Sequence, residues 1–306
     1  MLNPENETEA NIALNQELTF KKAEEVFAAH NLPFGAQQMQ TLGIRRNDQV
    51  FTNLALLLSD QCPFTIKAAV FQGTDQDHFA DRQEFGGSLF TQLEKCFDYL
   101  KLNNPTGATF SGLYRHDFKA YPDSAIREAL LNCIIHRDYS FSASTLISVY
   151  RDRMEFVSIG GLLPGVHKED ILIGLSVCRN KKLADIFYRL DLIEAYGTGL
   201  MKIRSAYKSN PQKPHIQVTP NAFKIILPRM EQNGQDSSSG RNLTQEETVL
   251  SYLAEHDAIT RRETEKLLGV SSSTAMGILK IMSDQGTIQK AGNGKTTRYI
   301  LPYQYL

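Results

Sequence analysis

Apolar residues recur at helical spacing in several segments of the first hundred residues. Residues 20–30 and 89–102 place such side chains three or four positions apart, which predicts two amphipathic helices. A shorter helix is predicted over 37–42, ending at Gly43, because glycine readily takes the backbone conformation of a helix stop. The apolar run 54–58 fits either a helix or a strand.

Extended periodicity dominates the middle of the chain. Residues 64–72, 144–150 and 153–158 read as strands, and strands over 216–228 close the region. Helices are expected between and after these strands: 170–173, 182–190 and one that opens at 197–199. The mixture predicts an α/β fold, with a mixed or antiparallel sheet covered on one face.

A polar segment interrupts the pattern near the C-terminus. Residues 232–242 carry no apolar side chain and are typical of a linker. Beyond them, helices are predicted over 246–255, 261–268 and 271–285, followed by two short strands around a glycine-rich turn. Three helices and a two-stranded wing indicate a winged helix-turn-helix.

These patterns divide the chain of 306 residues, a length that fits two or three domains. We expect an N-terminal helical segment, a central domain, a linker and a winged-helix domain, in that order: 1–60, 61–230, 231–241 and 242–306. The first 16 residues are polar, and we expect them to be loosely held.

Charge and cysteine content narrow the class of protein. Lys and Arg number 33 against 34 Asp and Glu, so binding to nucleic acid would need a local basic patch. The four widely spaced cysteines lack metal-ligand spacing and indicate free thiols in a reducing compartment. The polar start of the sequence is unlike a signal peptide, and we find no apolar run of the ~18–20 residues that span a bilayer. We expect a soluble cytoplasmic protein without membrane association.

The candidate chemistry begins with Glu128 and Asn132. They lie four positions apart on a helix predicted to start after Pro122, so both side chains share one face, and His136 continues the stripe. A carboxylate to polarise water and an amide oxygen for magnesium, with glycine turns further on, suggest a nucleotide site. The alternative is a plain core helix on which both side chains are merely solvated.

This helix resembles the N-box of the GHKL ATPase superfamily, which includes gyrase, the heat-shock protein 90 chaperones, the mismatch-repair MutL proteins and histidine kinases. The chain is similar in order and spacing, over residues 18–210, to a bacterial and archaeal branch of RecG-like C-terminal domains and transcriptional regulators. The motifs that carry this resemblance follow the helix: His136-Arg-Asp-Tyr139, Gly160-Gly161-Leu, Arg179-Asn180 and Gly197-Thr-Gly199. The resemblance implies a two-layer, Bergerat-like α+β fold that binds ATP.

It also implies individual roles. Asn132 would bind Mg²⁺ through its side-chain oxygen, and Glu128 would be the catalytic residue that polarises the attacking water. His136 would either line the nucleotide site or serve as a structural histidine or helix cap.

The other matched residues lie in two glycine turns that would hold the nucleotide: Ser158, Gly160, Gly161, Gly197, Thr198 and Gly199. The first turn would lie under base and ribose, and the second would let backbone N–H groups meet the phosphates. Residues 162–196 would cover the nucleotide. Ser158 departs from the superfamily pattern, because an aspartate normally stands there to read the adenine amino group.

The glycine-rich segment 291–297 looks like a P-loop but lacks its first glycine, since position 289 is Gln, and it lies between two strands. We therefore interpret it as the hairpin of the wing and consider helicase activity unlikely. The expected DNA contacts come from the start of the third helix and from basic side chains: Ser272, Ser273, Thr274, Lys280, Lys290, Lys295 and Arg298.

The sequence thus predicts a transcriptional regulator that binds double-stranded DNA through its winged helix and ATP with Mg²⁺ in its central domain, as a homodimer. Two alternatives stay open. One is an active Mg-dependent ATPase, and the other is a scaffold or dimerisation protein that binds no nucleotide.

Overall fold

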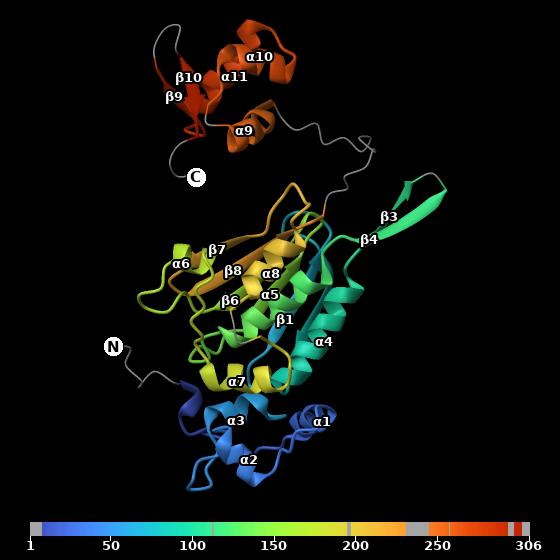
Figure 1. Cartoon of the computed structure of the whole chain (residues 1–306), viewed down its shortest axis with the longest axis vertical. Coiled ribbons are helices and arrows are strands. Elements are labelled where there is room, and N and C mark those ends of the chain that lie inside the picture. Colours follow the sequence, from blue (N-terminus) through green and yellow to red (C-terminus); the bar gives the residue numbers. More distant parts are fainter. Residues whose placement is uncertain are drawn as a thin grey trace. The chain divides into compact units, whose positions relative to one another are not determined.

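The protein divides into two compact units, Met1–Gly234 and Gln235–Leu306 (Figure 1). The computed structural model describes residues 8–111, 113–194, 197–230, 245–256, 258–292 and 297–301. The predicted linker, 231–241, spans the division and lies outside the described residues.

Unit 1 contains a 3-10 helix, eight α-helices and eight strands among its described residues. In chain order they are η2 (Thr8–Ala10), α1 (Lys21–Ala29), α2 (Ala36–Thr41), α3 (Asn53–Leu58), β1 (Ile66–Phe71), β2 (Phe79–Phe85), α4 (Leu89–Leu102), β3 (Thr106–Ser111), β4 (Tyr114–Lys119), α5 (Asp123–Ile135), β5 (Thr145–Val149), β6 (Arg153–Ile159), α6 (Lys168–Leu172), α7 (Lys181–Arg189), α8 (Gly199–Ala206), β7 (His215–Thr219) and β8 (Ala222–Pro228).

A mixed sheet forms the centre of unit 1. Within the described residues its strand order is β2-β1-β5-β6-β8-β7, with β1 and β5 parallel and every other neighbouring pair antiparallel. The side chains of β5 alternate as a half-buried strand should, because Ile147 and Val149 are buried whereas Leu146 is exposed. The expectation of a mixed α/β fold is confirmed.

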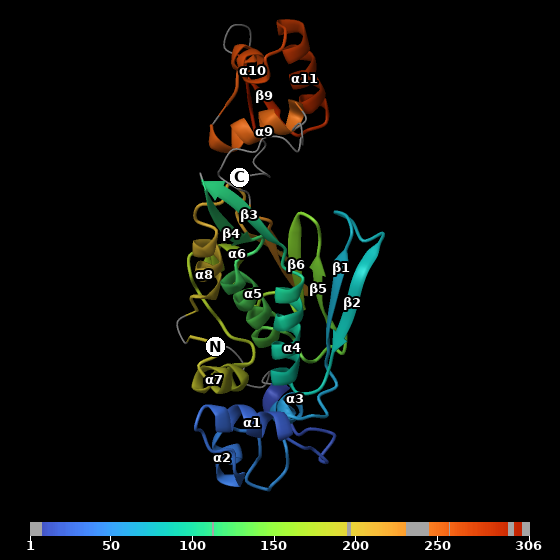
Figure 2. The same ribbon diagram turned by 90° about the vertical axis from the view of Figure 1, so that its right-hand side faces the viewer.

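Helices α4, α5 and α8 cover one face of this sheet (Figure 2). Helix α5 lies between the other two and against β6 and β8. Its residues Ala125, Ala129 and Cys133 are buried, as are Leu130 and Ile134 beside them. This broad apolar surface fixes the rotation of α5, and therefore the direction in which its polar residues point.

The start of the chain belongs to the same core. Phe20, Ala23 and Phe27 are buried in the cluster that also contains the helices on the sheet. The carboxylate of Glu9, itself buried, accepts hydrogen bonds from the backbone N–H groups of Lys182 and Leu183, at 2.7 and 3.1 Å. A carboxylate in this position stabilises the N-terminus of α7. The sequence pattern predicted a loose segment up to residue 16, whereas Glu9 is anchored in the fold.

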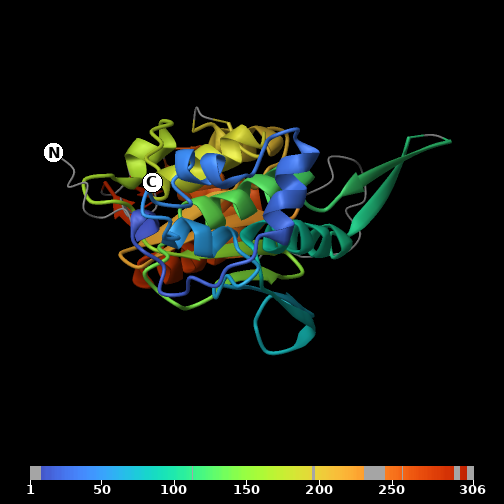
Figure 3. The ribbon, with the colours of Figure 1, turned by 90° about the horizontal axis from the view of Figure 1, so that it is seen from below.

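A long hairpin, β3–β4, extends from unit 1 beside α4 (Figure 3). It was not predicted from the sequence. The ring of Phe118 packs over Gly107, where a β-carbon would overlap it. The exposed side chains of Leu113 and Tyr114 lie at its turn.

Unit 2 has a separate hydrophobic core, which includes Val249, Leu253, Leu279 and Met282. Its described elements are α9 (Gln245–Glu255), α10 (Arg261–Leu268), α11 (Ser272–Asp284), β9 (Gln289–Ala291) and β10 (Arg298–Ile300), with β9 and β10 antiparallel. Gly269, in the left-handed conformation, ends α10.

Candidate nucleotide site

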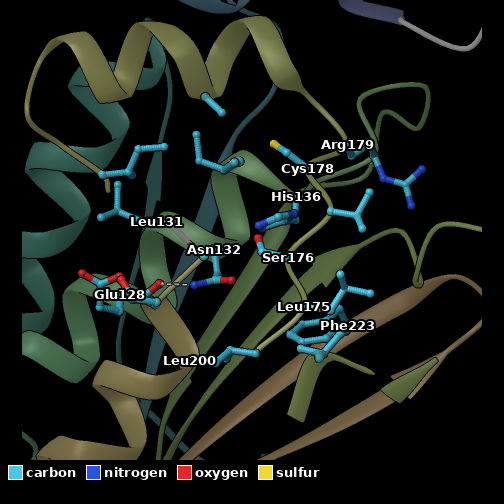
Figure 4. A pocket seen from close by; sticks show the side chains of 18 of the residues that line it. Glu128, Leu131, Asn132, His136, Leu175, Ser176, Cys178, Arg179, Leu200 and Phe223 are labelled. Carbon is cyan, nitrogen blue, oxygen red and sulfur yellow. Dashed lines mark hydrogen bonds between the residues drawn. The ribbon is translucent and has the colours of Figure 1, made fainter. Parts of the chain in front are cut away.

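A cavity of about 700 Å³ lies among α5, the end of β6, the segment before α7 and the start of α8 (Figure 4). All the central-domain residues predicted to form the site line it: Glu128, Asn132, His136, Ser158, Gly160, Gly161, Gly197, Thr198 and Gly199. The fold thus brings together in one pocket residues that are up to 71 positions apart (128 to 199) in the sequence.

One end of this cavity lies where α5 packs against α8, and the polar side chains of Glu128 and Asn132 line it. A β-carbon at Gly199 would stand only 3.0 Å from Glu128 Oε2 and 3.2 Å from Asn132 Nδ2. Glycine at the first residue of α8 therefore allows the helix backbone to approach both side chains. No other residue type would leave this space open.

The orientation of the Asn132 amide follows from its hydrogen bond. Asn132 Nδ2 donates to the backbone carbonyl of Glu128 at 2.8 Å. A carbonyl can only accept, so the amide nitrogen must face it, and the oxygen points away from Glu128 (Figure 4). That oxygen is the atom that could bind a cation.

Glu128 is held by its neighbour in the sequence. Its side chain is 12% exposed, and Oε1 accepts a hydrogen bond from Arg127 Nη1 at 2.8 Å. The other terminal nitrogen of Arg127 donates to the carbonyl of Leu192 at 2.6 Å. Arg127 was not predicted as a site residue, yet it joins the candidate catalytic carboxylate to the segment before α8.

The glycines also have structural reasons to be glycine. A β-carbon at Gly161 would lie 2.4 Å from the carbonyl oxygen of Thr219, and one at Gly197 would lie 2.3 Å from Ser176 Cβ. Gly160 has a φ of 101°, which disfavours any other residue. These turns are therefore required by the fold itself, independently of any ligand.

Ser158 is buried, and its hydroxyl donates to the carbonyl of Cys133 at 3.2 Å. This bond joins β6 to α5. The oxygen can still accept hydrogen bonds, but it supplies no negative charge to the cavity.

His136 follows the last residue of α5 and faces the cavity. Burial, and secondarily the positive charge of Arg179, lower the pKa of His136 to about 4. The ring is therefore neutral at pH 7, when it can both donate and accept a hydrogen bond.

Arg179 and Asn180 stabilise the far end of the cavity. Arg179 pairs with Asp138 at 3.2 Å and donates to the carbonyl of Gly161 at 2.9 Å. Asn180, which is buried, donates to the carbonyls of Ile135 and Arg137, both at 2.8 Å, and so satisfies the C-terminal end of α5. Asp138 of the His-Arg-Asp-Tyr motif therefore holds Arg179 in place.

Arg137 itself is buried away from Asp138. Its guanidinium donates to Thr145 Oγ1 at 2.9 Å and lies near the rings of Phe64 and Tyr139, with centroids at 5.0 and 5.3 Å. The acidic neighbour Asp138 pairs with Arg179 instead.

A second acidic residue lies beside the start of α8. Glu194 accepts a hydrogen bond from Thr198 Oγ1 at 2.8 Å and pairs with Lys202 Nζ at 2.6 Å. Glu194, Thr198 and Lys202 all line the cavity. Sequence reasoning missed Lys202, although its helical spacing from Thr198 could have indicated it.

Metal binding would depend on the ligand. The described residues contain no cluster of three or more His, Cys, Asp or Glu side chains able to hold a metal ion. Asn132 and Glu128 offer oxygen atoms, which Mg²⁺ prefers, and Mg²⁺ is commonly held by one or two such groups together with phosphates. The donor set therefore fits a cation that arrives with a phosphate-bearing ligand.

The residues of unit 2 predicted to contact DNA are exposed wherever the structure describes them: Ser272, Ser273, Thr274, Lys280, Lys290 and Arg298. Lys295 lies outside the described residues. The hydroxyl of Ser271 accepts a hydrogen bond from the N–H of Thr274 and so caps α11.

In the described part of both units, every helix is too short or too polar to cross a membrane.

Comparison with known proteins supports an ATP-binding class of domain. Residues 143–227 match the family described as "Putative ATP-dependent DNA helicase recG C-terminal". This segment runs from β5 into β8 and contains both glycine turns, but not Glu128 or Asn132.

The fold is similar to that in the crystal structure of the DIP2311 protein from Corynebacterium diphtheriae, with a TM-score of 0.65 and 18% sequence identity. The similarity covers 97% of this chain and 64% of that one, so the chain spans less than two thirds of the other protein's length. At this identity the likeness concerns the fold. No curated protein matches the chain.

Proposed function

We propose that unit 1 binds ATP with Mg²⁺ in the 700 Å³ cavity, within a Bergerat-like fold. The observation that carries this proposal is the approach of Gly199 to Glu128 and Asn132. It brings the start of a helix, the carboxylate of Glu128 and the side-chain amide of Asn132 together at one end of a cavity.

Different groups around the cavity suit different parts of Mg-ATP. The N–H groups at the start of α8 would meet phosphate oxygens, for which the helix dipole is favourable. The side-chain oxygen of Asn132 would bind Mg²⁺, which shields phosphate charge when bound. Gly160 and Gly161 would border base and ribose, and the neutral ring of His136 would offer them a hydrogen bond.

Calorimetric titration with Mg-ATP tests this proposal. Asn132→Ala should abolish saturable binding or weaken it at least about tenfold, since hydrogen bonds and ligands to charged groups contribute about 1.5–3 kcal/mol. Asn103→Ala, a change at the C-terminal end of α4 outside the cavity lining, is the matched control. Equal affinity in wild type and Asn132→Ala would refute the role of Asn132, and no binding in the wild type would favour a scaffold.

We further propose that unit 2 is a winged helix-turn-helix that binds double-stranded DNA. The supporting observation is α11, which follows a tight glycine turn, is capped by Ser271 and exposes Ser272, Ser273 and Lys280. Exposed hydroxyls and N–H groups at a helix start suit phosphate and base-edge contacts. Lys290 and Arg298 on the β9–β10 hairpin would add phosphate contacts.

Salt dependence of DNA binding provides the test. Replacing Lys280, Lys290 and Arg298 together by Ala should weaken binding to any duplex. It should also make the fall of log affinity with log salt less steep, by about 0.9 for each phosphate that is no longer neutralised. The same replacement at Lys21, Lys67 and Lys101, all exposed on unit 1, is the control. An unchanged slope would exclude binding of DNA phosphates by these side chains.

Together, the two units would make a cytoplasmic transcriptional regulator whose affinity for DNA responds to Mg-ATP. Cys62, Cys96 and Cys133 are free and buried, as suits a reducing compartment. A homodimer would match a palindromic site, and sedimentation equilibrium would test it. Anisotropy of a labelled duplex, with and without Mg-ATP, tests the coupling.

A further inference from the structure

The carboxylate of Glu194 is an anionic group that lines the cavity. Glu194 places one carboxylate oxygen 2.6 Å from Lys202 Nζ and the other 2.8 Å from Thr198 Oγ1. Both partners belong to the start of α8, one helical turn apart. Lys202 and Thr198 also pull the pKa of Glu194 below its usual value, so the group is ionised at neutral pH.

This position coincides with the polar end of the cavity. Gly199, which follows Thr198, is the residue whose backbone lies against Glu128 and Asn132. Thr198, Lys202 and Glu194 all line the same cavity as these two side chains. An ammonium group and a hydroxyl beside a helix start form a set of donors that suits a phosphate oxygen as well as a carboxylate.

We propose that Glu194 is a built-in competitor for the polyphosphate of the ligand, and that Lys202 and Thr198 bind the terminal phosphates once Glu194 is displaced. This inference rests on the proposed nucleotide function and adds to it two phosphate-binding residues and one residue that opposes binding.

The exchange is favourable on simple electrostatic grounds. Glu194 and Lys202 are well exposed, with side-chain accessibilities of 54% and 39%, and ion pairs of this kind are weak. A triphosphate brings more negative charge to Lys202 than one carboxylate does. A monophosphate has less to gain from the exchange, so Glu194 would favour ligands with longer phosphate chains.

A purely structural role for Glu194 makes the opposite prediction. If the pair with Lys202 only held the start of α8 in place, removal of the charge on Glu194 would loosen the site and weaken binding. If Glu194 competes with the ligand, the same change strengthens binding. The sign of the effect therefore separates the two roles.

The experiment compares the affinity of the full chain for Mg-ATP and for inorganic triphosphate by calorimetry. Glu194→Gln keeps the shape of the side chain and its hydrogen bond to Thr198. It should raise the affinity for both ligands about two- to fivefold, the range expected for an exposed ion pair. Lys202→Met keeps the apolar stem and should weaken both about tenfold. Glu169→Gln, an exposed acid of α6 outside the cavity lining, should change neither.

The double variant provides the decisive comparison. With Lys202 replaced by Met, Glu194→Gln should no longer tighten binding appreciably, because the competition for Lys202 has gone. Mg-ATP binding that Glu194→Gln leaves unchanged or weakens would overturn this inference and leave the nucleotide site intact. Absence of binding in every variant, Glu194→Gln included, would overturn both proposals.

Discussion

The backbone of Gly199 lies against the carboxylate of Glu128, so closely that an added β-carbon would stand 3.0 Å from Oε2. This contact joins the first residue of α8 to the middle of α5. It defines the point at which a ligand could meet a helix start, a carboxylate and an amide at once.

Gly199→Ala should therefore reduce Mg-ATP affinity at least about tenfold while it changes the free energy of unfolding by less than about 1.5 kcal/mol. The new methyl group displaces the Glu128 side chain, which is flexible enough to move, and blocks the approach of the ligand. Gly86→Ala is the control, since its β-carbon would meet only Thr65 Cγ2 at 3.8 Å. Calorimetry and urea unfolding measure the two effects, and undiminished affinity in Gly199→Ala would argue against the site.

Gly161→Ala should act on the fold instead. Its β-carbon would meet the backbone oxygens of Thr219 and Pro220 at 2.4 and 2.5 Å, and backbone cannot move aside as a flexible side chain can. We expect a loss of about 1–3 kcal/mol in the free energy of unfolding. Gly73→Ala, where the nearest atom is 3.6 Å away, should stay within about 0.5 kcal/mol. Equal stabilities in urea titrations of the two variants would contradict this packing argument.

The titration of His136 should make unit 1 less stable in mild acid. The pKa of this histidine is lowered to about 4 in the folded protein, chiefly by burial, and lies near 6.5 in the unfolded chain. Between these values the unfolded chain binds the additional proton, so the free energy of unfolding falls as the pH falls from 6.5 to 4, by up to about 3 kcal/mol.

His136→Gln removes the group that binds this proton. The free energy of unfolding should then change less between pH 6.5 and pH 4. Urea unfolding at pH 7 and pH 4.5 measures the difference. Glu155 and Asp60, whose pKa values are lowered by their partners, would continue to reduce stability at still lower pH in both proteins. Identical profiles for wild type and His136→Gln would show that this histidine is not the group responsible.

Gly277→Ala should separate the stability of unit 2 from its binding to DNA. Gly277 lies exposed in the interior of α11, and no atom stands within 4 Å of the position that a β-carbon would take, so the fold has no need of glycine there. Alanine should stabilise the helix by about 1 kcal/mol. If α11 approaches DNA closely, the same methyl group should weaken binding several-fold.

Hydrogen exchange of the α11 amides and anisotropy of a labelled duplex measure these two effects. Gly286→Ala is the matched control, since Gly286 has a φ of 74° and alanine there should destabilise unit 2 without a direct effect on DNA contacts. Unchanged DNA affinity in the more stable Gly277→Ala would show that this face of α11 is not the DNA-binding surface.

The sequence was most informative where one periodicity governed a whole element. The apolar stripe of α4 and the shared face of Glu128 and Asn132 follow from helical geometry alone. By contrast, β2 exposes almost all its side chains and so shows no alternation of buried and exposed positions. Its place in the sheet depends on pairing with β1, which no local pattern could reveal.

The candidate site was predictable to a similar extent. Helical spacing predicted that Glu128 and Asn132 share one face of a helix. The glycine turns predicted a nucleotide site beside them. The pairing of Glu194 with Lys202 and that of Arg127 with Leu192 depend on how the segment before α8 turns back onto α5. Helical spacing from Thr198 could have indicated Lys202, but the partners of Glu194 and Arg127 are fixed only by the tertiary structure.

The hydrogen bonds of Glu9 to the start of α7 also constrain the order in which the chain can fold. Glu9 and Lys182 are 173 residues apart, so the carboxylate of Glu9 finds its partner only after a further 173 residues have been made. At about 5–20 residues per second, synthesis separates the two by about 9–35 s. Throughout that interval the carboxylate of Glu9 lacks its native partners, and contacts of such high sequence separation form slowly. The cavity wall next to α7 should accordingly be among the last parts of unit 1 to become native.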